Sequence, residues 1–145
     1  VEVSIYTPSQ CNRQSWKVRL YKGDRKDFIL NHQYGNAGFG KSINLVLFVT
    51  GLMSSFSHKA RHGARIDGAL FAMSLMYALH DLGLGTCPLN TSYTILEEHK
   101  LRKEINLSFA EEPIMMIGVG HLKDEFVIAN SPKKNIKDIL IYDEI

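Results

Sequence analysis

The sequence predicts a single domain of the mixed α/β or α+β class. The chain has 145 residues, which is about the length of one domain. Strand-like and helix-like apolar patterns follow one another in the order strand, helix, strand, helix, helix, strand. No repeat and no linker-like change in composition divides the chain. The apolar fraction of 45% and the charged fraction of 22% are near the averages of folded globular proteins.

The first half of the chain predicts two strands around a short helix. Residues 16–21 alternate between apolar and polar side chains, as a half-buried strand does. Residues 24–30 are expected to form a short helix. Residues 43–50 are nearly all apolar and rich in Val, Ile and Phe, which favours a second strand. Ahead of these elements, residues 7–12 predict a polar loop or a helix entry, with Ser9 as its N-cap.

Residues 66–82 give the strongest helix prediction of the second half. Leu70, Met73 and Tyr77 supply one apolar face, while Phe71 and Leu75 lie on others. A helix that is apolar nearly all round is a buried one. In a domain this small, full burial indicates that a second subunit covers one side.

The remaining elements follow from local signals. Gly83 and Gly85 are expected to end the long helix. Thr94 and Glu97 have the spacing of a capping box, which predicts a helix that starts there and runs to about residue 106. Residues 113–120, rich in Ile and Met, predict a strand, and residues 136–141 a last helical turn or strand.

Composition excludes several classes of function. The net charge of +2 gives no electrostatic signature of nucleic-acid binding. The apolar stretch at residues 69–79 is much shorter than the roughly 20 residues that span a bilayer, so we expect no membrane segment. Residues 1–6 show no secretory signal, and two cysteines suit a reducing cytosol. His58 and His62 have helical metal-ligand spacing but no third ligand nearby, so no metal site is expected.

Residues 35–42, GNAGFGKS, fit the phosphate-binding P-loop pattern G-x-x-x-x-G-K-[ST] in full. A P-loop also needs a helix directly after the Lys-Ser pair, so that the helix N-terminus faces the phosphates. Here Lys41 and Ser42 precede a predicted strand. We therefore favour a glycine-rich loop before a strand, and keep a P-loop nucleotide-binding protein as an alternative function.

Three segments carry a resemblance to a known family. Residues 8–16 read PSQCNRQSW, which is similar to the P-S-x-x-N-x-Q-P-W segment of the nitroreductase family of flavin enzymes. Residues 67–73 and 82–90, DGALFAM and LGLGTCPLN, resemble that family's long central helix and its G-L-G-T-C exit. Residues 113–130, followed by Lys133 and Lys134, are similar to its last core strand and basic phosphate contact. Their order and spacing extend the resemblance over nearly the whole chain.

The resemblance implies one nitroreductase-like α+β domain over residues 1–145, with a central mixed or antiparallel sheet flanked by helices. It implies a cytoplasmic homodimer with the long central helix buried at the interface and FMN bound between the subunits. The expected activity is ping-pong hydride transfer from NADH or NADPH to a small organic acceptor, of the nitroaromatic or quinone type.

By the same resemblance, the flavin contacts fall in three groups. We expect the ring contacts to be Pro8, Ser9, Asn12 and Gln14 in one segment, Pro88, Leu89, Asn90 and Thr91 in another, and the phosphate contacts to be Lys133 and Lys134. Amide and backbone N–H donors of this kind stabilise negative charge on a reduced flavin. The flavin performs the redox step, so no catalytic side chain is expected.

Two features depart from the family pattern. Ser15 stands where the family usually has Pro. Family members also begin with an Arg-rich helix that grips the FMN phosphate, and nothing from Val1 onward supplies it. Either this element has been removed, or the chain is a reduced version with weaker flavin affinity. The second case leaves a non-catalytic binding module as a further alternative.

Overall fold

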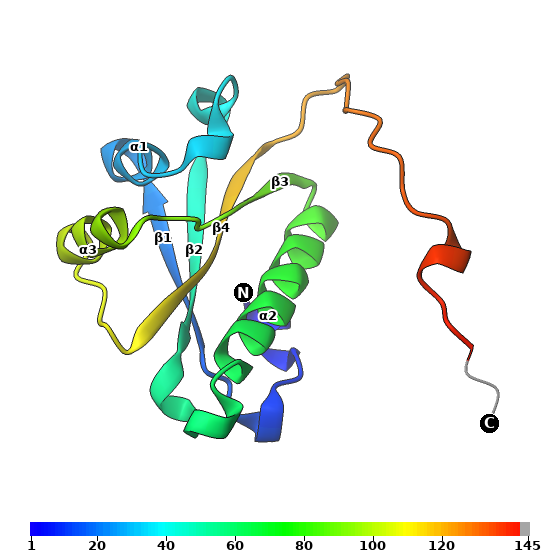
Figure 1. The fold of residues 1–145 in the computed structure, drawn as a ribbon. Helices are drawn as coiled ribbons and strands as arrows, with labels where there is room; N and C mark the ends of the chain where they lie inside the picture. Colours follow the sequence, from blue (N-terminus) through cyan, green and yellow to red (C-terminus); the bar gives the residue numbers. More distant parts are fainter. Residues whose placement is uncertain (143–145) are drawn as a thin grey trace.

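A computed structural model describes residues 1–142 and shows an α+β fold, as expected (Figure 1). The strands are β1 (Trp16–Lys22), β2 (Leu45–Leu52), β3 (Leu84–Leu89) and β4 (Glu111–His121). They form one sheet in the order β1-β2-β4-β3, and each neighbouring pair is antiparallel. The α-helices are α1 (Gly23–Leu30), α2 (Gly63–Asp81) and α3 (Ile95–Glu104).

Helices cover both faces of the sheet, α1 and α3 on one face and α2 on the other (Figure 1). Strand β2 contributes to both cores because successive side chains of a strand point to opposite faces. Val46 and Phe48 pack in the core beneath α1 and α3. Leu47 and Val49 pack in the core beneath α2. This double burial explains why residues 45–49 of the strand are all apolar.

Helix α2 lies very close to β2 at its N-terminal end. A Cβ atom added to Gly51 would stand 2.7 Å from the carbonyl oxygen of Ala64, which is closer than real side chains come. The two backbones can therefore approach only because Gly51 has no side chain. This contact fixes the start of α2 over the sheet.

Most of the predicted elements are confirmed. The strands expected over residues 16–21, 43–50 and 113–120 and the helix over 24–30 form within one or two residues of their predicted limits. The capping box is present, with the Thr94 hydroxyl accepting from the Glu97 N–H and the Glu97 carboxylate accepting from the Thr94 N–H. Gly83 follows α2 with φ of +74°, a conformation that suits glycine.

One expectation about the elements was wrong. The predicted element order omits β3, whose sequence LGTCPL contains a glycine and a proline and therefore has little strand propensity. The long helix forms as expected, and within one chain α2 keeps an apolar stripe on its surface, on one helix face. Coverage of this side by a second subunit stays a prediction. The exposed fractions of the stripe residues are 60% for Ile66, 45% for Leu70, 41% for Met73 and 66% for Tyr77.

After β4, residues 122–127 still border the loop at Phe39 and Ser42, and the remainder of the segment to residue 142 runs apart from the other elements (Figure 1). All residues of this segment, 122–142, are exposed, including the apolar side chains of Phe126, Val127 and Ile139. It contains the single 3-10 turn Ile136–Asp138, which agrees with the last helical turn expected there. In residues 1–142, no helix is both long enough and apolar enough to cross a membrane.

Candidate functional site

The first predicted group lies in a loop that is tied to α2. Ser9 precedes the short 3-10 helix Gln10–Asn12. The Gln10 N–H donates to both carboxylate oxygens of Asp67, at 3.1 and 3.2 Å, and Asp67 is a buried residue of α2. The Gln14 N–H donates to the Ser9 hydroxyl at 3.0 Å. These bonds fix the loop against the N-terminal half of α2.

The same loop holds three residues in an uncommon backbone conformation. The φ angles of Cys11, Asn12 and Gln14 are +52°, +55° and +48°. The left-handed region costs a residue with a side chain about 1 kcal/mol, and such costs often mark binding sites. The Gln14 Nε2 donates to the Asn12 Oδ1 at 3.0 Å, and both side chains are exposed. With its oxygen occupied, Asn12 retains its amide N–H groups as donors.

The second predicted group follows the end of β3. The Leu89 side chain is buried in the core beneath α1 and α3, so only its backbone can face a ligand. Asn90 is exposed, and its carbonyl oxygen accepts from the Gln33 Nε2 at 3.5 Å. The Thr91 hydroxyl donates to the Ile114 carbonyl oxygen at 3.3 Å. Pro88, in β3 itself, is exposed.

Thr91 lines a pocket of about 460 Å³ together with Arg65, Ala69 and Glu112. Arg65 and Glu112 form an ion pair and hydrogen bond, and this hydrogen bond raises the pKa of the Arg65 guanidinium. Sequence reasoning missed this pair because the two residues are far apart in the chain and follow no motif. The pocket brings Thr91 to the stretch of α2 that the first loop also contacts, through Asp67.

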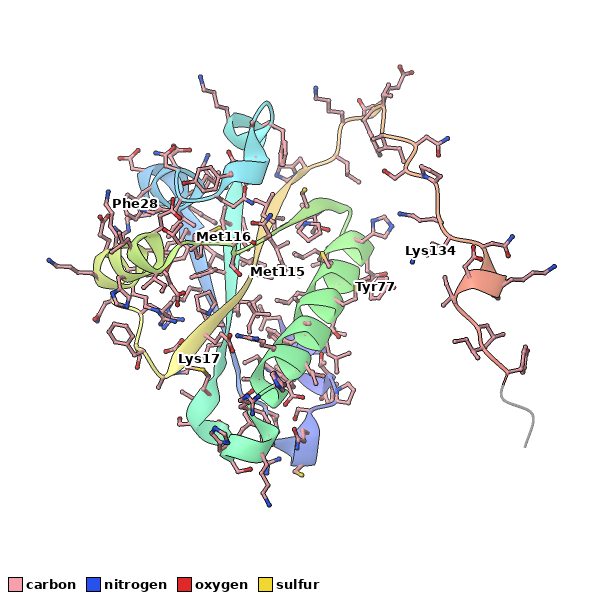
Figure 2. The ribbon with its side chains drawn as sticks, in the orientation of Figure 1. Lys17, Phe28, Tyr77, Met115, Met116 and Lys134 are labelled. Atoms are coloured by element: carbon pink, nitrogen blue, oxygen red, sulfur yellow. The ribbon has the colours of Figure 1, made fainter. Side chains whose placement is uncertain are left out.

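The third predicted group lies elsewhere. Lys133 and Lys134 are exposed residues of the segment that runs apart from the body, as Figure 2 shows for Lys134. Pro8 lines a different hollow, a groove of about 970 Å³ that also includes Tyr77. Neither this groove nor the Thr91 pocket contains members of all three groups. In a single copy of the chain, the three groups are therefore not gathered in one pocket.

A separate cluster of charged residues surrounds Glu111, at the start of β4. Arg19 donates two hydrogen bonds to its carboxylate, at 2.7 and 3.0 Å, Thr50 donates a third at 2.8 Å, and Lys17 approaches to 3.3 Å. Arg102 donates to the Glu111 carbonyl oxygen at 2.8 Å. The Arg19 hydrogen bonds lower the pKa of the Glu111 carboxyl to about 2 despite its burial. This cluster links strands β1, β2 and β4 to α3 and is structural.

The described part of the chain holds no group of three or more His, Cys, Asp or Glu side chains placed to bind a metal ion. Lys41 and Ser42 of the P-loop-like motif are followed by β2 and not by a helix, as the sequence predicts.

Comparisons with known proteins agree with this architecture. No curated protein matches the sequence. Three similar solved structures are nitroreductase CinD from Lactococcus lactis in complex with 4-nitrophenol, a protein named as a nitroreductase in complex with FMN from Desulfovibrio desulfuricans, and a protein named as an NAD(P)H:FMN oxidoreductase from Staphylococcus epidermidis.

The likeness to these structures is one of fold. The sequence identities are 15%, 18% and 16%, with TM-scores of 0.76, 0.79 and 0.79. The matches cover 99%, 99% and 97% of this chain and 84%, 81% and 81% of the respective other chains. The sequence model of the Nitroreductase family matches residues 22–121, most of the described chain. The chain therefore belongs to the nitroreductase family.

Proposed function

We propose that this protein is an FMN-dependent oxidoreductase. The family supports an oxidoreductase that uses a flavin, and two of the similar structures carry FMN in their names. The chemistry that FMN supplies when bound is hydride transfer from NADH or NADPH to a small organic acceptor, in two separate half-reactions. A nitroaromatic or quinone acceptor is part of the proposal, and the 4-nitrophenol complex of CinD supports the nitroaromatic class.

The strained loop at Cys11, Asn12 and Gln14 is the observation on which the proposal depends. Its donors are neutral amides and backbone N–H groups, which stabilise the charge of a reduced flavin ring without giving up a proton. The hydrogen bond between Gln14 and Asn12 orients both amides before any ligand arrives. Holding donors in place in advance lowers the reorganisation needed during reaction. The residues present therefore fit a flavin.

The other two groups supply the remaining contacts in this proposal. The backbone of Pro88 to Thr91 would lie along the ring, where the exposed turn after β3 offers N–H groups. Lys133 and Lys134 would meet the phosphate, since adjacent ammonium groups neutralise a phosphate dianion. The three groups of predicted contacts lie apart within one chain, so in this proposal two copies of the chain together complete the flavin site.

We propose a homodimer in which the apolar stripe of α2 (Ile66, Leu70, Met73 and Tyr77) is covered by a second copy. Exposed apolar side chains spaced along one helix face are typical of an interface. Tyr77 also borders the groove that contains Pro8, so the stripe is continuous with the first predicted group. A cytoplasmic location completes the proposal, since Cys11 is an exposed free thiol and a reducing compartment preserves thiols.

The experiment is a titration of the purified chain with FMN, followed by anaerobic mixing with NADH or NADPH. We expect flavin fluorescence to change on binding and the visible absorbance of the bound flavin to bleach with NAD(P)H. Addition of a quinone should restore the absorbance. Absence of flavin binding would contradict the proposal, and binding without bleaching would indicate a non-catalytic module.

A further inference from the structure

The loop that matches the P-loop pattern forms one wall of a pocket that the proposed flavin site does not use. The pocket has a volume of about 640 Å³ and is lined by Lys26, Asp27, Asn31, Asn36, Gly38 and Lys41, among others. None of the lining residues is among the predicted flavin contacts. The pocket lies between α1 and the loop that leads into β2, on the face of the sheet opposite α2.

Two ammonium groups give this pocket a net positive charge. The Lys26 side chain is only 9% exposed, and its partner, Asp27 at 2.7 Å, has a carboxylate that is 60% exposed. An exposed carboxylate is a weak counter-ion because solvent screens it. Lys41 has no ion-pair partner within residues 1–142. Two ammonium groups therefore face one solvent-screened carboxylate, and the positive charge that is not neutralised favours binding of an anion.

The loop is held open by its glycines and by Asn36. The Asn36 Nδ2 donates to the Leu30 carbonyl oxygen at 2.8 Å, which anchors the loop to the end of α1. A Cβ atom at Gly40 would collide with the Asn36 amide oxygen, so a side chain there would displace the amide from its present position. Gly38 has φ of +90° and no atom within 4 Å of a would-be Cβ, so it is needed for its conformation and borders open space. The loop geometry is therefore fixed without a ligand.

We propose that this pocket binds the phosphate group of a small phosphate-bearing ligand, with Lys26 and Lys41 as its cationic contacts and the Asn31 amide as a further donor. Lysine and amide N–H groups around a glycine-rich loop are suited to phosphate oxygens. Because β2 and not a helix follows the loop, the site lacks a helix N-terminus. Binding should therefore depend on the lysines and on ionic strength. It should not require magnesium, since the lysines neutralise the phosphate directly.

The test is calorimetric titration of the full chain with inorganic pyrophosphate in the presence of excess FMN, which saturates any flavin phosphate site. We expect pyrophosphate to bind, and Lys41→Ala to weaken binding about tenfold, as loss of one charge-assisted hydrogen bond does. Lys59→Ala, which removes an exposed lysine outside the pocket, should leave the affinity unchanged. Lys26→Met should also weaken binding, and its unfolding curve shows whether the buried substitution preserves the fold.

Repeating the titration with ATP identifies the source of the phosphate. Tighter binding of ATP than of pyrophosphate supports a nucleotide ligand, and equal binding supports a free phosphate. The proposal is overturned if pyrophosphate does not bind, or if Lys41→Ala and Lys59→Ala have the same affinity. It is also overturned if only the double variant Lys133→Ala, Lys134→Ala loses binding. None of these outcomes depends on NAD(P)H oxidation, so failure here is separate from failure of the proposed oxidoreductase.

Discussion

The two faces of the sheet differ in the arrangement of the apolar side chains that their helices leave exposed. On the α1 and α3 face, Phe48 and Leu101 are fully buried and both helices pack inward. On the other face, the inner side of α2 buries Phe71 and Leu75 with equal completeness. The outer side of α2, however, exposes the apolar stripe (Ile66, Leu70, Met73 and Tyr77) to solvent. Exposed apolar side chains also occur on the α3 side, at Ile95 and Leu96, at the start of that helix. Those of α2 instead continue along one helix face from Ile66 to Tyr77, and we propose that a second copy covers them.

The largest expected effect comes from placing a charge in the stripe. If the proposed dimer forms through this stripe, Leu70→Asp should convert it to monomers and reduce flavin retention. A buried Leu contributes roughly 1.5–3 kcal/mol, and two-fold symmetry doubles the loss, so the dimer dissociation constant should rise by about 10² to 10⁴. Size-exclusion chromatography with light scattering measures the change.

The matched control is Leu20→Asp, on β1, where the native leucine is similarly exposed but lies outside the stripe. This variant should remain dimeric. If the wild-type chain is a monomer at all concentrations, or if both variants dissociate alike, the stripe of α2 is not the interface of a dimer.

The next effect concerns the cluster around Glu111. Arg19→Met removes the guanidinium that donates two hydrogen bonds to a buried carboxylate. Breaking a buried pair in this way costs about 3 kcal/mol, which urea unfolding measures. Lys17→Met serves as control, because Lys17 contacts the same carboxylate from an exposed position and its loss should cost less than about 1 kcal/mol. Equal losses would show that burial does not set the strength of this cluster.

A somewhat smaller effect is expected with acid. The pKa of Glu111 is lowered to about 2 in the folded chain, from an ordinary value of 4.5. A lowered carboxyl pKa stabilises the folded state above the ordinary value, and this contribution is lost as the pH falls from about 4.5 towards 2. The loss should be about 2–3 kcal/mol. Unfolding curves recorded across this interval measure it.

Glu97 acts in the same direction, because hydrogen bonds from Tyr34 and Thr94 lower its pKa to about 2 as well. The variants Glu111→Gln and Glu97→Gln, measured separately, show how much each carboxyl contributes to the change in the free energy of unfolding with pH. If the free energy of unfolding of Glu111→Gln falls with acid as much as that of the wild-type chain, Glu111 is not the main source of the pH dependence.

The smallest effect is expected at the strained loop. Asn12→Ala should weaken FMN binding by about 1–3 kcal/mol, since a hydrogen-bond partner is lost. Asn12→Gly tolerates the positive φ but lacks the amide, so it should show the same loss if the amide matters. Asn106 also has a positive φ, at +52°, and lies outside the predicted contacts, so Asn106→Ala is the control. If both Asn12 variants bind FMN with wild-type affinity, the Asn12 side chain does not contact the flavin.

Local signals in the sequence predicted most of the fold. The apolar run of β2, the capping box at Thr94 and the alternation of β1 each depend on neighbouring residues, which a sequence displays directly. Strand β3 was missed because its formation depends on β4 and not on its own propensity.

Less of the candidate site than of the fold could be predicted from the sequence. The ion pair of Arg65 and Glu112 joins two distant segments, and the positive φ of Gln14 accompanies a hydrogen bond from its N–H to the Ser9 hydroxyl. Neither feature has a local signature. The three predicted groups came from a family resemblance, and their meeting across two copies stays a prediction.

The order of strands in the sheet also limits how the protein aggregates. Its two outermost strands, β1 and β3, would each offer free backbone groups to a passing chain. Pro88 removes a donor from β3, and Lys22 places a positive charge at the end of β1, where Lys17 and Arg19 are paired with Glu111. Such features oppose amyloid-like growth by strand addition. Strand addition is thereby disfavoured at β3, whereas the proposed pairing through the stripe of α2 is closed and ends at two copies.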